Sequence, residues 1–129
     1  MILVDSSVWI DYLSAKVSRP ENKIDPLTRP DNQAVVTGII IQEILQGIRN
    51  LRSFELTRKM MTSFPVVIPS ASTHASAAAL YQEVMRKGNQ VSTVDALIAA
   101  LAIEHRLPLY TFDADFQNIA KHTRLQLFY

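Results

Sequence analysis

The chain contains no cysteine, only three glycines, one tryptophan and three histidines among its 129 residues. Without cysteine it can form no disulfide, no thiolate zinc site and no cysteine nucleophile. His74, His105 and His122 have neither the spacing of a metal-binding pair nor a Gly-x-Ser-x-Gly partner, which excludes the usual nucleophilic hydrolases. No run approaches the roughly 18 apolar residues of a membrane span, and Asp5 interrupts the apolar start. We therefore expect no signal peptide and a cytoplasmic protein.

The composition is that of an ordinary globular protein, with 48% hydrophobic and 19% charged residues. Together with the length, it predicts a single domain spanning residues 1–129, with a core large enough to fold alone. The formal net charge is only +1. If a divalent metal holds four of the 12 acids, the remaining eight face 13 bases, and this balance of about +5 favours a polyanionic partner.

Short β-rich runs alternate with helical patterns along the chain, which predicts an α/β fold with a central parallel sheet of four to five strands between helices. The expected strands are residues 2–4, 35–37, 66–68, 109–112 and 125–128. The expected helices are residues 7–14, 38–51, 54–63, 73–87 and 93–106, with a short helical turn after Asp113. Trp9, which opens the first helix, is expected in the core. Residues 15–33 are polar and hold three of the six prolines, which predicts a mobile surface excursion with one helical turn.

Two carboxylates stand out in the first half of the chain. Asp5 follows the first apolar strand and precedes a helix, a position where open α/β sheets bind ligands, although an ordinary helix cap shared with Ser6 or Ser7 explains it equally well. Glu43 falls on the apolar stripe of the second large helix, beside Ile40. A buried carboxylate needs a partner, so the alternatives are a functional site or a salt bridge to a nearby base.

Two further carboxylates lie in the second half. Asp95 fits a capping box with Ser92, yet the helix that it opens is apolar nearly all round, which places Asp95 near the packed middle of the protein. Asp113 ends an apolar strand, and capping again competes with function there. Asp115 competes with Asp113 for whatever role exists. We favour Asp113 because it lies nearer the strand end.

A shared location connects the four acids. In a right-handed doubly wound sheet, the ends of the first and fourth strands are neighbours, and the helices carrying Glu43 and Asp95 begin at that edge. Two carboxylates about 5 Å apart repel by roughly 3 kcal/mol at an effective dielectric of 20, so a purely structural role does not explain four together. A hard divalent cation removes this repulsion, and all-oxygen ligation selects Mg²⁺ or Mn²⁺ over Zn²⁺. A water with its pKa lowered by the metal is a natural nucleophile for a phosphodiester.

Four stretches in order resemble PIN-domain ribonucleases, and closely the VapC-type toxins of toxin–antitoxin pairs. They are MILVDSSVWIDYL, IIIQEILQG, KGNQVSTVDALIAALAIEHRLPLYTFDADF and a final short strand. The resemblance implies that Asp5, Glu43, Asp95 and Asp113 form the acidic metal site, with Ser7 and Thr111 as supporting polar residues. It also implies a three-layer α/β/α fold, a homodimer, Mg²⁺- or Mn²⁺-dependent cleavage of RNA, and an antitoxin that inserts a peptide across the acidic groove.

The resulting hypothesis is an endoribonuclease toxin that hydrolyses RNA phosphodiester bonds with a metal-activated water. Asp5, Asp95 and Asp113 ligate the metal, while Glu43 is either a ligand or the group that orients the water. The alternative is a non-catalytic module of the same fold that binds RNA or a protein. One region departs from the family pattern: many relatives carry a well-formed helix or pair of helices where residues 15–33 are broken by proline.

Overall fold

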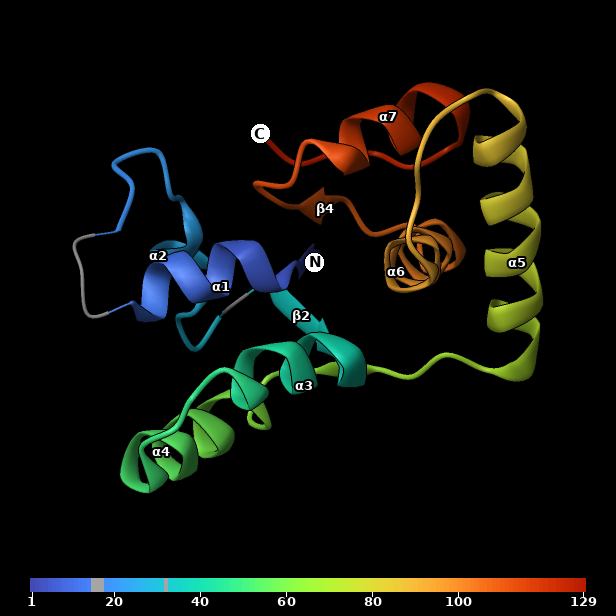
Figure 1. Ribbon diagram of the computed structural model, residues 1–129. Coiled ribbons are helices and arrows are strands. Elements are labelled where there is room, and N and C mark those ends of the chain that lie inside the picture. The colour runs from blue at the N-terminus through green and yellow to red at the C-terminus, as the bar shows by residue number, and fades with distance from the viewer. Residues whose placement is uncertain (15–17, 32) are drawn as a thin grey trace. The chain divides into compact units, whose positions relative to one another are not determined.

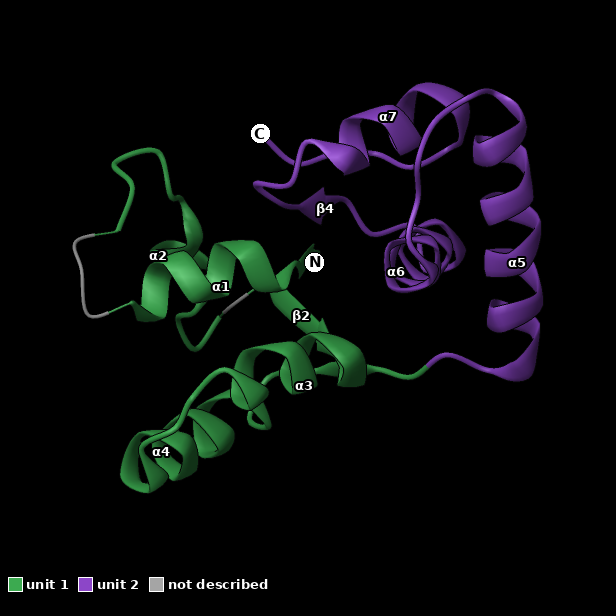
Figure 2. Ribbon diagram, in the orientation of Figure 1, with its two compact units in different colours: residues 1–68 green, residues 69–129 purple. Residues whose placement is uncertain are grey.

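The computed structural model describes residues 1–14, 18–31 and 33–129. The chain divides into two compact units, residues 1–68 and residues 69–129 (Figure 2). Within the described part, no helix combines the length and the apolar character needed to cross a membrane.

Parallel strands organise the first unit. They are β1 (Ile2–Val4), β2 (Ala34–Thr37) and β3 (Val66–Val67). The strand β2 lies between the other two, with Ile2 opposite Ala34 and Val36 opposite Val66. Every residue of β1 and β2 is buried. Continuous burial without alternation is typical of parallel strands that are covered on both faces.

The longer helices of the first unit are α1 (Ser6–Leu13), α3 (Gly38–Gln46) and α4 (Leu51–Met61) (Figure 1). Helix α3 contacts both α1 and α4. Ile40 and Ile44 are buried one turn apart on α3, as a helix with one apolar face requires. Trp9 is fully buried on α1 with its ring centroid 5.1 Å from that of Phe64, which confirms its expected place in the core.

The predicted excursion holds the single helical turn α2 (Ile24–Leu27). Ile24 is fully buried. The Asn22 side-chain amide donates to the Val8 carbonyl at 3.2 Å and to an Asp11 carboxylate oxygen at 2.8 Å, so the start of α2 is attached to α1. The prediction of mobility also covered residues 15–17 and 32, which lie outside the described residues.

The second unit contains α5 (Ala71–Arg86), α6 (Thr93–Glu104), the strand β4 (Leu109–Tyr110) and α7 (Asp115–His122). Helix α6 packs against α5, and six of its residues are buried. The start of α5 is closed by a capping box between Ser70 and Thr73. The hydroxyl of Thr73, itself fully buried, also donates to the carboxylate of Glu104 at 2.9 Å, which ties the beginning of α5 to the end of α6.

Most predicted elements differ from the structure by one to three residues at their ends, and three differ more. The helix predicted over 38–51 ends at Gln46, because Asn50 accepts a hydrogen bond from the Ser53 N–H at 2.9 Å and caps a new helix, α4. The strand predicted over 125–128 is only a parallel bridge between Leu109 and Leu127. The short turn after Asp113 extends into the eight-residue helix α7, since Phe116 and Ile119 are both buried.

Candidate functional site

Asp5 joins β1 to α1 and is 5% exposed. It occupies the N-cap position, but its side chain makes no cap hydrogen bond. Instead, its Oδ2 accepts a hydrogen bond from the Ser7 hydroxyl at 2.8 Å. A carboxylate this deeply buried costs several kcal/mol of desolvation unless charge or hydrogen bonds compensate it. The capping explanation considered for Asp5 therefore does not account for its side chain.

Glu43 lies on α3, half-buried beside Ile44. Its Oε1 accepts a hydrogen bond from the Ser6 hydroxyl at 3.3 Å. Burial, followed by the charge of Asp5, raises the pKa of Glu43 above its ordinary value, and the Ser6 hydrogen bond opposes this increase. No Lys or Arg forms an ion pair with Glu43 among the described residues. Within that part of the chain, the salt bridge considered as an alternative is therefore absent.

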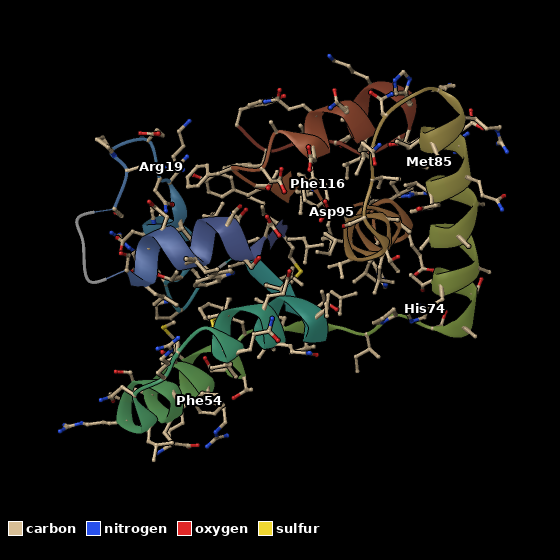
Figure 3. The ribbon with its side chains drawn as sticks, viewed as in Figure 1. Arg19, Phe54, His74, Met85, Asp95 and Phe116 are labelled. Carbon is tan, nitrogen blue, oxygen red and sulfur yellow. The ribbon has the colours of Figure 1, made fainter. Side chains whose placement is uncertain are left out.

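The second unit carries its own acidic group at the starts of α6 and α7. Carboxylate oxygens of Asp95, Asp113 and Asp115 all lie within 4.8 Å of one another. Figure 3 labels Asp95 on α6 and Phe116 on α7. Asp115 is the first residue of α7, and Asp113 lies just before that helix. Asp95 is half-buried and Asp115 is exposed. Their proximity concentrates negative charge at one end of this unit.

Local hydrogen bonds fix the acids of the second unit. The backbone N–H of Asp95 donates to the Ser92 hydroxyl at 3.0 Å, the cap that the sequence predicts. The N–H of Asp113 donates to the Thr111 hydroxyl at 3.0 Å, and Asp113 Oδ1 accepts from the Asp115 N–H at 2.9 Å. Capping and clustering therefore coexist here.

The structure brings the predicted residues together in two pairs, each within one unit. Asp5 acts electrostatically on Glu43 in the first unit, and Asp95 lies near Asp113 in the second. Asp115, considered in the sequence only as a competitor of Asp113, belongs to the same group. Sequence reasoning missed the contact between Ser6 and Glu43. The signal that was available is the pair of serines directly after Asp5.

An apolar groove of about 500 Å³ lies in the first unit between α1, α3 and α4. Glu43 contributes a carboxylate to the lining of the groove, and the other lining residues are largely apolar. Among them, Ile10 is 52% exposed and Leu56 is 60% exposed. Exposed aliphatic side chains beside a groove are typical of a surface that binds another molecule.

All of these acids offer oxygen ligands, and such ligands suit Mg²⁺, Mn²⁺ or Ca²⁺ rather than a soft metal. Ligand oxygens around Mg²⁺ are about 3 Å apart when adjacent and about 4 Å apart when opposite, given metal–oxygen distances of about 2.1 Å. The spread of 4.8 Å in the second unit exceeds this only slightly. Small side-chain rotations would thus suffice to place these oxygens around one ion.

Buried parallel strands followed by helices, with clustered carboxylates at the helix starts, define an α/β protein with a candidate site for a hard cation. The chain belongs to the PIN domain family, whose model matches residues 2–122. It is 32% identical over 129 residues to Ribonuclease VapC11 of Mycobacterium tuberculosis, covering 98% of this chain and 96% of the relative.

Solved structures show the same fold. FitAcB from Neisseria gonorrhoeae superposes with a TM-score of 0.80 at 18% identity, covering 100% of this chain and 97% of that chain. A toxin-antitoxin complex from Klebsiella pneumoniae matches with a TM-score of 0.73 at 28% identity, covering 90% of both chains. The predicted PIN-like α/β/α fold is confirmed.

Proposed function

We propose that this protein is a metal-dependent endoribonuclease and the toxin of a toxin–antitoxin pair. The observation that carries the proposal is the group of Asp95, Asp113 and Asp115, whose oxygens lie within 4.8 Å, in a chain 32% identical to a VapC ribonuclease. Clustered carboxylates repel one another, and a divalent cation or a bound proton offsets that repulsion. The cation also attracts the phosphate of an RNA substrate.

The active site that we propose comprises Asp5, Glu43, Asp95 and Asp113. Asp5 follows β1 and Asp113 follows β4, and the carboxyl ends of strands are where open α/β sheets bind ligands. The charge of Asp5 acts on Glu43, which supports a shared role for these two. Asp115 is the alternative to Asp113.

The ion that we propose is Mg²⁺, with Mn²⁺ as a substitute, because every ligand available in this set is a carboxylate or hydroxyl oxygen. When bound, such an ion neutralises phosphate charge and lowers the pKa of a coordinated water. The protein's own contribution is orientation. The Ser7 hydroxyl restrains the Asp5 carboxylate, and the Ser6 hydroxyl restrains that of Glu43.

Glu43 has the properties of a proton acceptor. Burial and the charge of Asp5 raise its pKa, and a general base works best when its pKa lies near the working pH. We therefore assign Glu43 either to the ligand set or to the orientation of the attacking water.

The partner that we propose is an antitoxin protein, by analogy with the Klebsiella pneumoniae toxin-antitoxin complex. The groove between α1, α3 and α4 is the place that suits an apolar antitoxin segment, and Glu43 at its lining connects it to the acidic residues. We also propose that the protein forms a homodimer and that it acts in the cytoplasm, where such a toxin meets RNA.

The test is cleavage of total RNA by the purified protein, freed of antitoxin, with Mg²⁺ or Mn²⁺. We expect products that disappear with EDTA and that fall about 100-fold or more in the Asp95→Asn variant, since even residues that only orient a metal ligand contribute 10–100-fold. Folding of the variant is checked by circular dichroism. Intact RNA in every lane, together with RNA binding that survives EDTA, would instead support a non-catalytic binding module.

A further inference from the structure

A second pocket, of about 320 Å³, lies in the second unit at the carboxyl end of α6. Its lining is Ala102, Ile103, Arg106, Leu107, Arg124 and Gln126. The acids of this unit lie at the opposite end of α6. From Asp95 to Glu104, the last residue of α6, nine residues span about 14 Å at the helical rise of 1.5 Å per residue. The pocket is thus distinct from the acidic group.

The pocket is positively charged. Two of its lining residues are arginines and none carries a carboxylate. Within the described residues, the guanidinium groups of Arg106 and Arg124 have no hydrogen-bond or ion-pair partner, whereas Arg58 and Arg86 each pair with a glutamate on their own helix. The nearest acid in sequence, Glu104, lines a different pocket and is bonded to Thr73 and His105.

The backbone of Arg106 is unusual. Its φ of 55° lies in the left-handed region, which favours glycine. It ends α6 in a Schellman motif, in which the Leu107 N–H donates to the Ala102 carbonyl at 2.9 Å and the Arg106 N–H donates to the Ile103 carbonyl at 3.2 Å. An arginine where glycine is the less strained residue suggests that its side chain has a use.

The helix end itself disfavours an anion, because its carbonyl groups carry about half a negative charge. Two guanidinium groups carry two positive charges, and the Schellman hydrogen bonds already occupy two of the last carbonyls. The balance is therefore positive. Arginine presents a planar fork of donors that matches phosphate oxygens, and Ile103 and Leu107 offer apolar surface for a sugar or base.

We propose that this pocket binds a backbone phosphate of the RNA substrate, through Arg106 and Arg124, at a nucleotide other than the one that is cleaved. The choice of RNA rests on the proposed function. The acids and the pocket lie at opposite ends of α6, about 14 Å apart along the helix, so the bound phosphate is too far away to be the reacting one. The pocket would therefore add affinity and fix the direction of the strand, without taking part in the reaction.

The first experiment measures binding of a labelled single-stranded oligouridine to the full chain in EDTA, where no cleavage occurs. The double variant Arg106→Gln/Arg124→Gln is expected to bind about tenfold more weakly or worse, the effect of losing a charge-assisted contact. The slope of log affinity against log salt concentration should fall by about 0.7 for one lost phosphate contact.

The matched control is Arg49→Gln/Arg52→Gln, which removes the same charge from exposed residues outside the pocket and should change neither quantity. Equal losses in both double variants, or no loss in the pocket variant, would overturn the proposal.

The second experiment uses Arg106→Gly, which relieves the left-handed backbone strain while it removes the guanidinium group. We expect a thermal midpoint higher by a few degrees and weaker oligouridine binding in the same variant. A merely structural role for Arg106 predicts the first change without the second, and that result would also contradict the proposal.

The two proposals can fail separately, because this binding requires no metal. If Asp95→Asn cleaves RNA as well as the wild-type protein while the pocket variants bind poorly, the nuclease site is misassigned and the phosphate site stands. If metal-dependent cleavage is confirmed but binding ignores Arg106 and Arg124, only the phosphate site is wrong.

Discussion

The acids of the two units differ in what surrounds them. Asp5 and Glu43 in residues 1–68 are buried or half-buried, and each accepts a hydrogen bond from a serine hydroxyl. The group in residues 69–129 is more exposed, and its oxygens and amides bond mainly to the adjoining turns. Burial raises the pKa of Glu43 and so makes its charge costly, whereas Asp115 is exposed and water screens its charge. The comparison shows that carboxylates in the two units differ in the desolvation cost of their charge before any ligand binds.

The largest expected effect on RNA cleavage comes from removing the charge of the buried acid Asp5. We expect Asp5→Asn to lower metal-dependent RNA cleavage about 100-fold or more while the protein stays folded, since asparagine keeps the shape and removes the charge. Ser7→Ala, which removes only the hydrogen bond to Asp5, should cost about 10-fold. Cleavage rates and circular dichroism of both variants decide the matter. Normal cleavage by Asp5→Asn would exclude Asp5 from the active site.

A second comparison lies within the acidic group of the second unit. Asp113→Asn is expected to lower cleavage about 100-fold, and Asp115→Asn less than about tenfold, because Asp113 lies nearer the end of β4 at Tyr110 while Asp115 is exposed in the first turn of α7. The same RNA assay, run on the two single variants side by side, measures this ratio. The reverse order would make Asp115 the fourth acid.

The smallest effect concerns stability. The ordinary pKa of a glutamate is near 4.5, and that of Glu43 is raised in the folded protein. Folding therefore disfavours the charged form, so Glu43 destabilises the metal-free protein above its raised pKa, and this destabilisation disappears as the pH falls toward the ordinary value. In EDTA, Glu43→Gln should raise the thermal midpoint at neutral pH and leave it nearly unchanged at pH 4. A variant that is less stable at neutral pH would contradict the assignment.

Much of this fold follows from local patterns in the sequence. The run Ile2–Val4 is apolar and β-rich, and the acid and serines that follow it predict the start of α1. The apolar character of α6 likewise predicts its burial. The break between α3 and α4 was predicted a few residues too late, at residues 52–53 instead of 47–50, although Asn50 three residues before Ser53 is a recognisable cap. The full length of α7 was missed although Phe116 and Ile119 have helical spacing.

Only part of the candidate site could be predicted from the sequence. Position at a strand end selects Asp5 and Asp113, and an apolar helix face selects Glu43. Whether Asp115 joins Asp95 and Asp113 depends on side-chain distances that no spacing rule provides. The pocket lined by Arg106 and Arg124 could not be predicted from the sequence either. It depends on the left-handed backbone of Arg106 and on the folding of residues 124–126 next to the end of α6, and neither follows from a sequence pattern.

Trp9 gives the chain a built-in optical probe. It is the single tryptophan in the sequence and it is fully buried within residues 1–68, so its fluorescence reports the packing of that unit. Far-ultraviolet circular dichroism, by contrast, follows helices in both units. Coincident unfolding curves from the two signals would indicate a single cooperative transition for residues 1–129, and separated curves would indicate that the two units melt independently. One indole ring therefore allows cooperativity to be measured without labelling the protein.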